Sequence, residues 1–212
     1  MGDDEKLITD IVDAARQLHP RFIALAGTPI PMITGCDLPA IAREVEGRTK
    51  IPSFAVPSNG IGTYVAGAGQ ALRLYAERFI TSRPEKRKNA VNILGATPLD
   101  FSVNGCVQSM ARRLEEAGFT LQSVFAMSSS IDAIDKAGAA EANLVVSSVG
   151  LPAAQYLQAQ FGTPYVIGAP FGDFFSPYVF DALRESIRTG APADVLGTFA
   201  PVSKNGGGIG GI

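Results

Sequence analysis

Two cysteines, one histidine and a set of serines are the residues of this 212-residue chain that could carry chemistry. A cysteine thiolate is a soft ligand for iron or zinc, whereas two cysteines are too few for a disulfide framework. Cys36 precedes a predicted helix, and a helix N-terminus stabilises a thiolate. Burial as a small apolar residue is the competing interpretation, and we favour it for Cys36 and for Cys106 on its amphipathic helix.

Several common active sites lack their residues. The single histidine, His19, precedes Pro20 at the end of a predicted helix. At that position a positive charge interacts favourably with the helix dipole, and we favour this role over membership of a Ser-His-Asp triad. Histidines and cysteines at zinc spacing are absent. Neither a Gly-x-Gly-x-x-Gly dinucleotide fingerprint after the first strand nor a Walker A sequence occurs, so we expect no NAD, no zinc and no ATP site of the usual kind.

Small and hydroxyl-bearing residues follow each strand expected in the second half of the chain. Such residues let a ligand approach the backbone and supply N–H and O–H donors at helix N-termini. Ordinary capping and turn formation explain any one loop, but four at one sheet edge predict a pocket. The four loops are Gly95–Pro98, Met127–Ser130, Ser147–Gly150 and Gly168–Gly172.

Short apolar runs alternate with helical stripes along the chain, which predicts an α/β fold of two Rossmann-like units, with parallel sheets flanked by helices. Right-handed crossovers then bring the strand-to-helix loops to one edge. Strands are expected at 22–26, 51–56, 91–94, 121–126, 144–146 and 165–167, and helices at 4–18, 37–46, 65–79, 103–117, 130–140, 151–161 and 177–188. We expect one domain over 1–83, a second over 84–190 and a linker over 191–212 towards a missing third domain. Within the chain, the basic run 83–88 is interpreted as a solvated connector.

Composition narrows the classes of partner. Apolar residues make up 46%, charged residues 18%, and the net charge is −2, so no broad basic surface is expected for nucleic acid. No apolar stretch approaches the roughly 18 residues that a membrane span needs. These features predict a cytoplasmic globular protein without nucleic-acid or membrane partners.

The order of several short motifs resembles the nitrogenase component 1 family, which includes molybdenum-iron protein subunits, cofactor-assembly scaffolds and dark-operative protochlorophyllide reductase subunits. Residues 28–41 are similar to its Thr-Cys…Ile-Gly-Asp-Asp-Ile segment, with Thr34-Gly35-Cys36-Asp37-Leu38 in the second part. Residues 57–67 resemble the segment that contains its Gly-Ser-x-Val-Thr-Gly, 91–95 its Asn-Ile-Leu strand, and 143–165 its strand, helix and Gly-x-Pro return. The likeness covers about residues 5–188, and the missing outer parts of the family's chain suggest a fragment.

The resemblance places the family's cluster-binding cysteine on Pro29, and the active-site cofactor's cysteine ligand at about Ser147 or Ser148. Neither proline nor a neutral hydroxyl replaces a thiolate on an iron cluster, so we expect no molybdenum-iron cofactor ligand here. The residues that we expect to bind a cofactor are Cys36, Thr28, Gly35, Asp37, Ser147, Ser148, Gly168 and Gly172, with Cys36 the candidate metal ligand.

The resemblance implies a subunit of a nitrogenase-like oxidoreductase. Such a subunit accepts electrons from an ATP-driven iron–sulfur reductase, and any iron–sulfur cluster belongs to the parent assembly with a homologous partner subunit. The alternative is a non-catalytic scaffold, or a module that binds a small molecule or a metallo-cofactor. Under either interpretation we expect no independent catalysis by the isolated chain, and the sequence does not identify the substrate.

Overall fold

The computed structural model describes residues 4–29, 35–58, 61–102 and 105–199. The chain divides into two compact units at Thr81/Ser82, two residues before the domain boundary expected from the sequence. Each unit is described by itself. No helix in the described ranges is long and apolar enough to cross a membrane.

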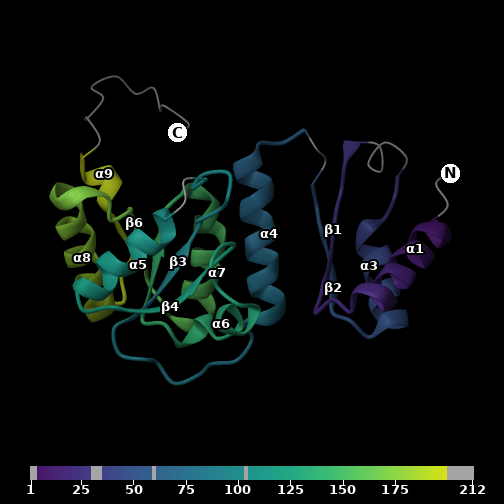
Figure 1. Cartoon of the computed structure of the whole chain (residues 1–212), viewed down its shortest axis with the longest axis horizontal. Coiled ribbons are helices and arrows are strands. Elements are labelled where there is room, and N and C mark those ends of the chain that lie inside the picture. Colours follow the sequence, from purple (N-terminus) through teal and green to yellow (C-terminus); the bar gives the residue numbers. More distant parts are fainter. Residues whose placement is uncertain (1–3, 30–34, 59–60, 103–104, 200–212) are drawn as a thin grey trace. The chain divides into compact units, whose positions relative to one another are not determined.

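The first unit has a parallel pair of strands between helices (Figure 1). Apolar residues at helical spacing on α1 and α3 meet in a small core, in which Val45 is fully buried. On the other side, Phe22 and Phe54 of the strand region stack on each other and pack edge-on or tilted against Tyr75 and Phe79 of α4, with ring centroids 4.7 to 6.2 Å apart. The elements are α1 (Asp4–Leu18), β1 (Ile23–Ala26), α3 (Leu38–Thr49), β2 (Ser53–Val56) and α4 (Tyr64–Phe79).

The second unit is a five-stranded parallel sheet in the order β4-β3-β5-β6-β7, with helices on its faces. All residues of β3 and β5 are buried, as their largely apolar composition indicates for central strands covered on both sides. The elements are β3 (Ala90–Leu94), α5 (Cys106–Glu116), β4 (Thr120–Val124), α6 (Ile131–Asp135), η1 (Ala137–Ala139), β5 (Ala142–Val145), η2 (Ser148–Gly150), α7 (Leu151–Phe161), β6 (Tyr165–Ile167), α8 (Gly172–Thr189), β7 (Ala193–Asp194) and α9 (Val195–Phe199).

A fully buried polar network crosses the middle of this sheet. The Asn92 amide nitrogen donates to the Ala137 carbonyl (3.0 Å) and to Asn143 Oδ1 (2.8 Å), while Ser123 Oγ donates to Asn92 Oδ1 (2.7 Å). Asn143 in turn donates to the Thr163 carbonyl at 3.4 Å. The network therefore satisfies polar groups on three neighbouring strands that would otherwise be buried without partners.

Helix α3 ends at Thr49, three residues beyond the end expected from the sequence, and two other helices differ from the expectation by more. Helix α8 begins at Gly172 rather than near 177, because Pro177 lies inside the helix and not at its start. The helix expected over 130–140 is instead the short α6 followed by the 3₁₀ turn η1. Both differences arise where a proline or a run of small residues gave an ambiguous local signal.

Two segments expected to be linkers are tied into the second unit. The Lys86 ammonium donates to the carbonyls of Gly138 (3.1 Å) and Ala140 (2.7 Å) and to Thr163 Oγ1, so these hydrogen bonds fix the connector to the second unit. Beyond residue 190, β7 pairs with β6 and Val195 is 6% exposed, so this stretch extends the sheet.

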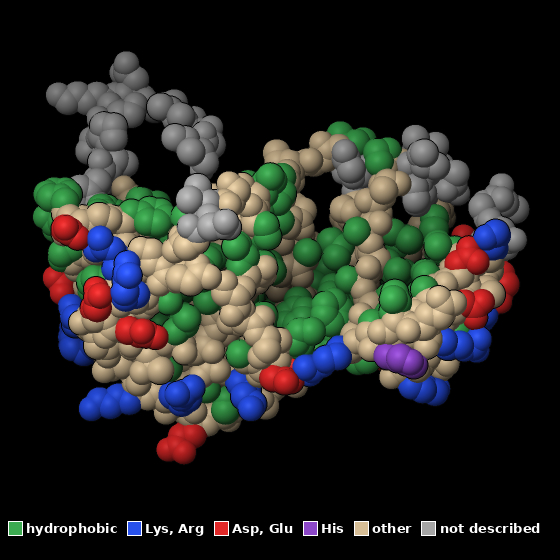
Figure 2. Space-filling model, viewed as in Figure 1, with side chains coloured by type: hydrophobic (Ala, Val, Ile, Leu, Met, Phe, Trp, Pro, Cys, Tyr) green, Lys and Arg blue, Asp and Glu red, His purple; other side chains and the backbone are tan. Residues whose placement is uncertain are grey.

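Charged side chains of both signs are interspersed over the visible face of each unit (Figure 2). Exposed apolar side chains occur around the start of α8 and in α9, where Phe174 is 76% and Leu196 is 53% exposed. The face shown thus has no single-sign charged region among the described residues.

Candidate functional site

The strand-to-helix loops of the second unit lie at one edge of its sheet, because all five strands are parallel. The chain passes from β3 to β4 on one side and then to β5 on the other, so the strand order reverses between β3 and β5. In open α/β sheets, ligands bind at such a switch point. The loops that meet there begin at Gly95 and Val146.

Tight backbone packing fills this switch point. A Cβ atom on Gly150 would lie 2.5 Å from the Leu94 carbonyl carbon, and one on Gly95 would lie 2.8 Å from the Gly150 nitrogen. Ser147 Oγ donates to the Gly95 carbonyl at 2.8 Å, which ties the two loops together. Ser147 therefore joins loops, and the neighbouring Ser148 presents an exposed side chain.

Asp100 is a residue of this edge that the sequence did not single out. Its Oδ2 accepts from Thr97 Oγ1 at 3.1 Å and from Ser147 Oγ at 3.4 Å. The hydroxyls of two loops thus converge on one exposed carboxylate. The second unit has no histidine to act as a base beside it, because the single one, His19, belongs to the first unit.

The two predicted glycines of the last loop have conformational and packing roles. Gly168 is buried, and a Cβ there would lie 3.2 Å from Val179 Cγ2. Gly172 has φ +66° at the start of α8, in the left-handed region that favours glycine. Arg113 donates to Asp173 at 3.0 Å and so braces this turn against α5.

In the first unit, the predicted residues cluster in sequence around the start of α3. Thr28 and Gly35 are exposed, and Gly35 has φ +72°. Asp37 caps α3, since its Oδ1 accepts from the Ala40 N–H at 2.9 Å. Cys36 is partly buried against the core between α1 and α3.

The surroundings of Cys36 favour the thiol. Burial raises the pKa of Cys36, and the nearby carboxylates Asp4 and Asp37 raise it further, with the thiol hydrogen-bonded to Asp4. This shift runs against the interpretation that the helix N-terminus stabilises a thiolate here, because burial and two carboxylates favour the neutral thiol. Packing as a small core residue is the interpretation that these contacts support.

These residues do not fit an iron–sulfur cluster. Pro29 has no donor atom, burial raises the pKa of the Cys36 thiol, and Ser147 Oγ donates to a carbonyl. Across the described ranges, no three His, Cys, Asp or Glu side chains group as a metal site. A cluster would need thiolates from outside these residues.

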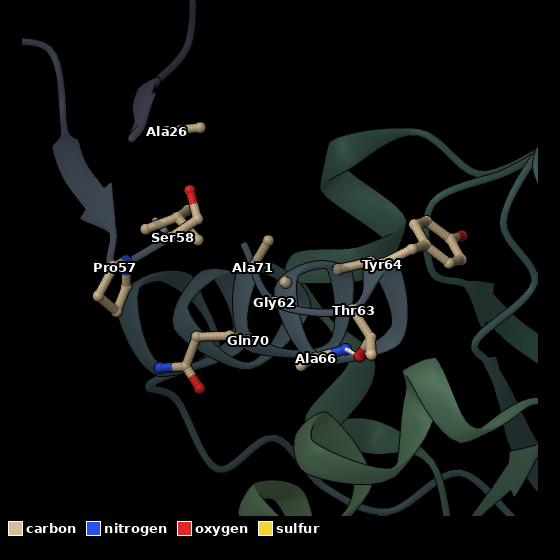
Figure 3. A pocket seen from close by; sticks show the side chains of 12 residues that line it. Ala26, Pro57, Ser58, Gly62, Thr63, Tyr64, Ala66, Gln70 and Ala71 are labelled. Carbon is tan, nitrogen blue, oxygen red and sulfur yellow. Dashed lines mark hydrogen bonds between the residues drawn. The ribbon is translucent and has the colours of Figure 1, made fainter. Parts of the chain in front are cut away.

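The first unit contains a cavity of about 730 Å³ at the carboxyl ends of its two strands (Figure 3). The end of β1 contributes Ala26, and the end of β2 with its following turn contributes Val56, Pro57 and Ser58. The opposite wall comes from residues between Gly62 and Ala71, on the turn before α4 and on its first two turns. Thr28, Gly35, Cys36 and Asp37 do not line it.

Local sequence positions this wall. Thr63 caps α4 by accepting the Ala66 N–H on Oγ1 at 3.3 Å, which fixes where the helix begins. Ser58 Oγ donates to the Gly27 carbonyl at 2.7 Å, and a Cβ on Gly27 would lie 2.3 Å from the Ser58 carbonyl oxygen. Glycine is therefore required where the turns after β1 and β2 approach each other. The sequence marked residues 57–67 as family-like but gave no reason to expect a cavity.

The chain is similar to redox and cofactor-assembly proteins. A sequence model described as nitrogenase component 1 type oxidoreductase matches residues 1–191. The light-independent protochlorophyllide reductase of Nostoc punctiforme has a subunit that is 26% identical over 181 residues, which cover 81% of this chain and 36% of that protein. Its counterpart from Prosthecochloris aestuarii is 36% identical over 171 residues, covering 80% of this chain and 32% of that protein.

A third relative is the nitrogenase iron-molybdenum cofactor biosynthesis protein NifE of Clostridium pasteurianum, 24% identical over 209 residues and covering 96% of this chain and 42% of that protein. Nitrogenase Cp1, solved at pH 6.5, superimposes with a TM-score of 0.76 at 21% identity, over 88% of this chain and 36% of that one. This likeness shows a shared fold. The chain spans about a third of the length of the first curated relatives it matches, at 36%.

Proposed function

Because this chain belongs to the nitrogenase component 1 type oxidoreductase family, we propose that it forms part of a catalytic-component subunit that accepts electrons from an ATP-driven iron–sulfur reductase. The family match over residues 1–191 carries this proposal, and the parallel-sheet fold supports it. A homologous partner subunit and a cytoplasmic location are parts of the same proposal.

Within that subunit, the described residues act as framework and ligand pocket. The Cys36 thiol packs against a core and Pro29 lacks a donor, so iron–sulfur ligands come from other parts of the assembly. The exposed Ser148 and the Asp100 carboxylate are polar groups at the carboxyl edge of the second unit's sheet.

The test is iron analysis and visible absorbance on the protein purified anaerobically from its native source. A protein-bound iron–sulfur cluster absorbs at about 400 nm. We expect iron, and reduction of the cluster by a family reductase with ATP. A Cys36→Ala variant should keep its iron, because the ligands lie elsewhere. A colourless, iron-free preparation would count against an electron-transfer role.

The second candidate is a non-catalytic scaffold or binding module of the same fold. The absence of a usable thiolate among the described site residues favours it. It predicts ligand-dependent increases in thermal stability without turnover when a reductase and ATP are supplied. Iron-dependent turnover would exclude this candidate.

A further inference from the structure

We propose that an open cavity at the amino end of β2, between α3 and α4, binds a small molecule that carries two linked phosphate groups. The volume of this cavity is about 670 Å³. It lies at the opposite end of β2 from the cavity in Figure 3 and shares no lining residue with it. Its described lining residues are Arg43, Glu46, Gly47, Lys50, Ser53 and Arg78.

Helix α3 and its C-cap bring three of the lining residues to one face. Arg43, Gly47 and Lys50 follow one another at intervals of four and three residues, which is the spacing of neighbours on a helix surface. At a rise of roughly 1.5 Å per residue, Arg43 and Lys50 start about 10 Å apart along the helix axis. Gly47 lies between them, and an added Cβ there would meet nothing within 4 Å outside its own helix backbone. The space between the two cations is therefore open.

The charged side chains of the wall leave a positive surplus. Both oxygens of the Glu46 carboxylate are used, since Oε1 accepts from the Arg78 guanidinium and Oε2 accepts from the Ser53 N–H at 3.0 Å. Among the residues that the structure describes, the Arg43 guanidinium and the Lys50 ammonium have no hydrogen-bond or ion-pair partner. Because Arg78 offsets Glu46, the charges of Arg43 and Lys50 remain available to a ligand.

The helix ends reduce this surplus without cancelling it. Helices α3 and α4 both end beside the cavity, and the carbonyl end of a helix carries roughly half a negative charge that acts over its last turn. Lys50 at the end of α3 and Arg78 in the last turn of α4 offset these partial charges. Arg43 lies more than one turn before the end of α3, so its charge has no such counterpart. About one positive charge remains even when both helix ends are counted.

These features select phosphate groups as the recognised part of the ligand. A guanidinium binds phosphate oxygens through paired N–H donors, and a lysine ammonium adds a point charge. A single phosphate would contact one of the two free cations, whereas two linked phosphates reach both across Gly47. The volume lies within the roughly 300–1,000 Å³ of common ligand sites. The described lining residues include no apolar side chain larger than glycine, so the phosphates carry the recognition.

Gly47 allows a test that changes charge alone. Glutamate and glutamine have nearly the same shape and helix propensity, and the open space beside Gly47 accommodates either. Gly47→Glu places a carboxylate between Arg43 and Lys50, where it competes with an anionic ligand. Gly47→Gln adds the same bulk without the charge. The difference between the two variants therefore isolates the electrostatic part of binding.

The experiment is isothermal titration calorimetry of the 212-residue chain with inorganic pyrophosphate at low ionic strength. Wild type should bind one pyrophosphate per chain. Arg43→Gln and Lys50→Gln should each weaken binding by about tenfold through loss of a charge-assisted hydrogen bond. Gly47→Glu should bind at least about tenfold more weakly than Gly47→Gln, because like charges repel at this distance. If Gly47→Glu does not fold, the two glutamine variants of the cations still test the site.

Three controls define the site and its ligand. Arg73→Gln removes a cation of α4 that pairs with Glu77 and does not line the cavity, so it should leave the affinity unchanged. Inorganic phosphate should bind at least about tenfold more weakly than pyrophosphate, since it makes one charge-assisted contact fewer. Malonate, with two carboxylates and a lower charge, should also bind more weakly.

Equal pyrophosphate binding by Gly47→Glu and Gly47→Gln would overturn the proposal, as would a loss in Arg73→Gln as large as that in Arg43→Gln. No binding by wild type would overturn it as well. Phosphate or malonate binding as tight as that of pyrophosphate would reject the paired-phosphate ligand. These measurements need neither iron nor a reductase, so their outcome is independent of the proposed electron-transfer function.

Discussion

Replacing Asn92 with alanine tests the buried polar network at the centre of the second unit. The substitution removes one acceptor and two donor contacts at once and leaves the Ala137 carbonyl, Asn143 Oδ1 and Ser123 Oγ without this partner. Asn92 and Asn143 are fully buried and Ser123 is 1% exposed, so water does not replace these bonds. The Ala137 carbonyl still accepts the Ala140 N–H, so Asn143 Oδ1 and Ser123 Oγ are the two groups that lose their partner. At about 1–2 kcal/mol for each of them, we expect a loss of about 2–4 kcal/mol in the free energy of unfolding.

Ser123→Ala is the matched comparison, because it removes only the bond to Asn92 Oδ1. It should cost about 1–2 kcal/mol. The double variant should cost less than the sum of the two, since both single changes remove the same bond.

The assay is urea-induced unfolding followed by circular dichroism, with the midpoint and slope of the second unit's transition compared among the variants. A loss for Asn92→Ala no larger than that for Ser123→Ala would refute the reasoning. It would mean that the groups left behind find other partners within the sheet.

Titratable groups give three further expected outcomes. Burial lowers the pKa of Lys86, so the charged form of this side chain lowers the free energy of unfolding. This cost disappears as the pH rises through the lowered pKa towards 10.5. In urea titrations over that pH range, wild type should therefore gain stability relative to Lys86→Met. The Ser53 N–H lowers the pKa of Glu46, so Glu46 stabilises the fold above pH 4.5 and loses this effect as the pH falls through its lower folded pKa; Glu46→Gln should flatten the acid limb of the stability curve. Burial raises the pKa of Cys36, so in a Cys106→Ala background its maleimide labelling should reach half its maximal rate above pH 9.0, and a midpoint below that value would restore the thiolate interpretation.

Much of the fold was predictable because its signals are local. The apolar stripe of residues 4–18 predicted α1 with both ends correct, and the pattern over 151–161 did the same for α7. Short apolar runs predicted β3 and β6 because central parallel strands are buried on both faces and read as continuous hydrophobic segments. Alternation of strand and helix then implied that the loops share one sheet edge.

The candidate site was less predictable because its chemistry depends on residues distant in sequence. Cys36 precedes a helix, as expected, but burial and the Asp4 carboxylate of α1 raise the pKa of its thiol. Ser147 lies at the predicted edge, but its hydroxyl is used by a carbonyl that belongs to the loop after β3. No periodicity in the sequence reports either contact.

The sequence by itself determined the family, the α/β class and the absence of a cysteine at the position of Pro29. Only the tertiary structure decided that the switch point is closed by Gly95 and Gly150, and that an uncharged cavity opens between the strand ends and α4. The physical reason is that hydrophobic periodicity is a property of neighbouring residues. Cavities, orphaned hydrogen-bonding groups and shifted pKa values arise from the distances between segments that the chain brings together when it folds.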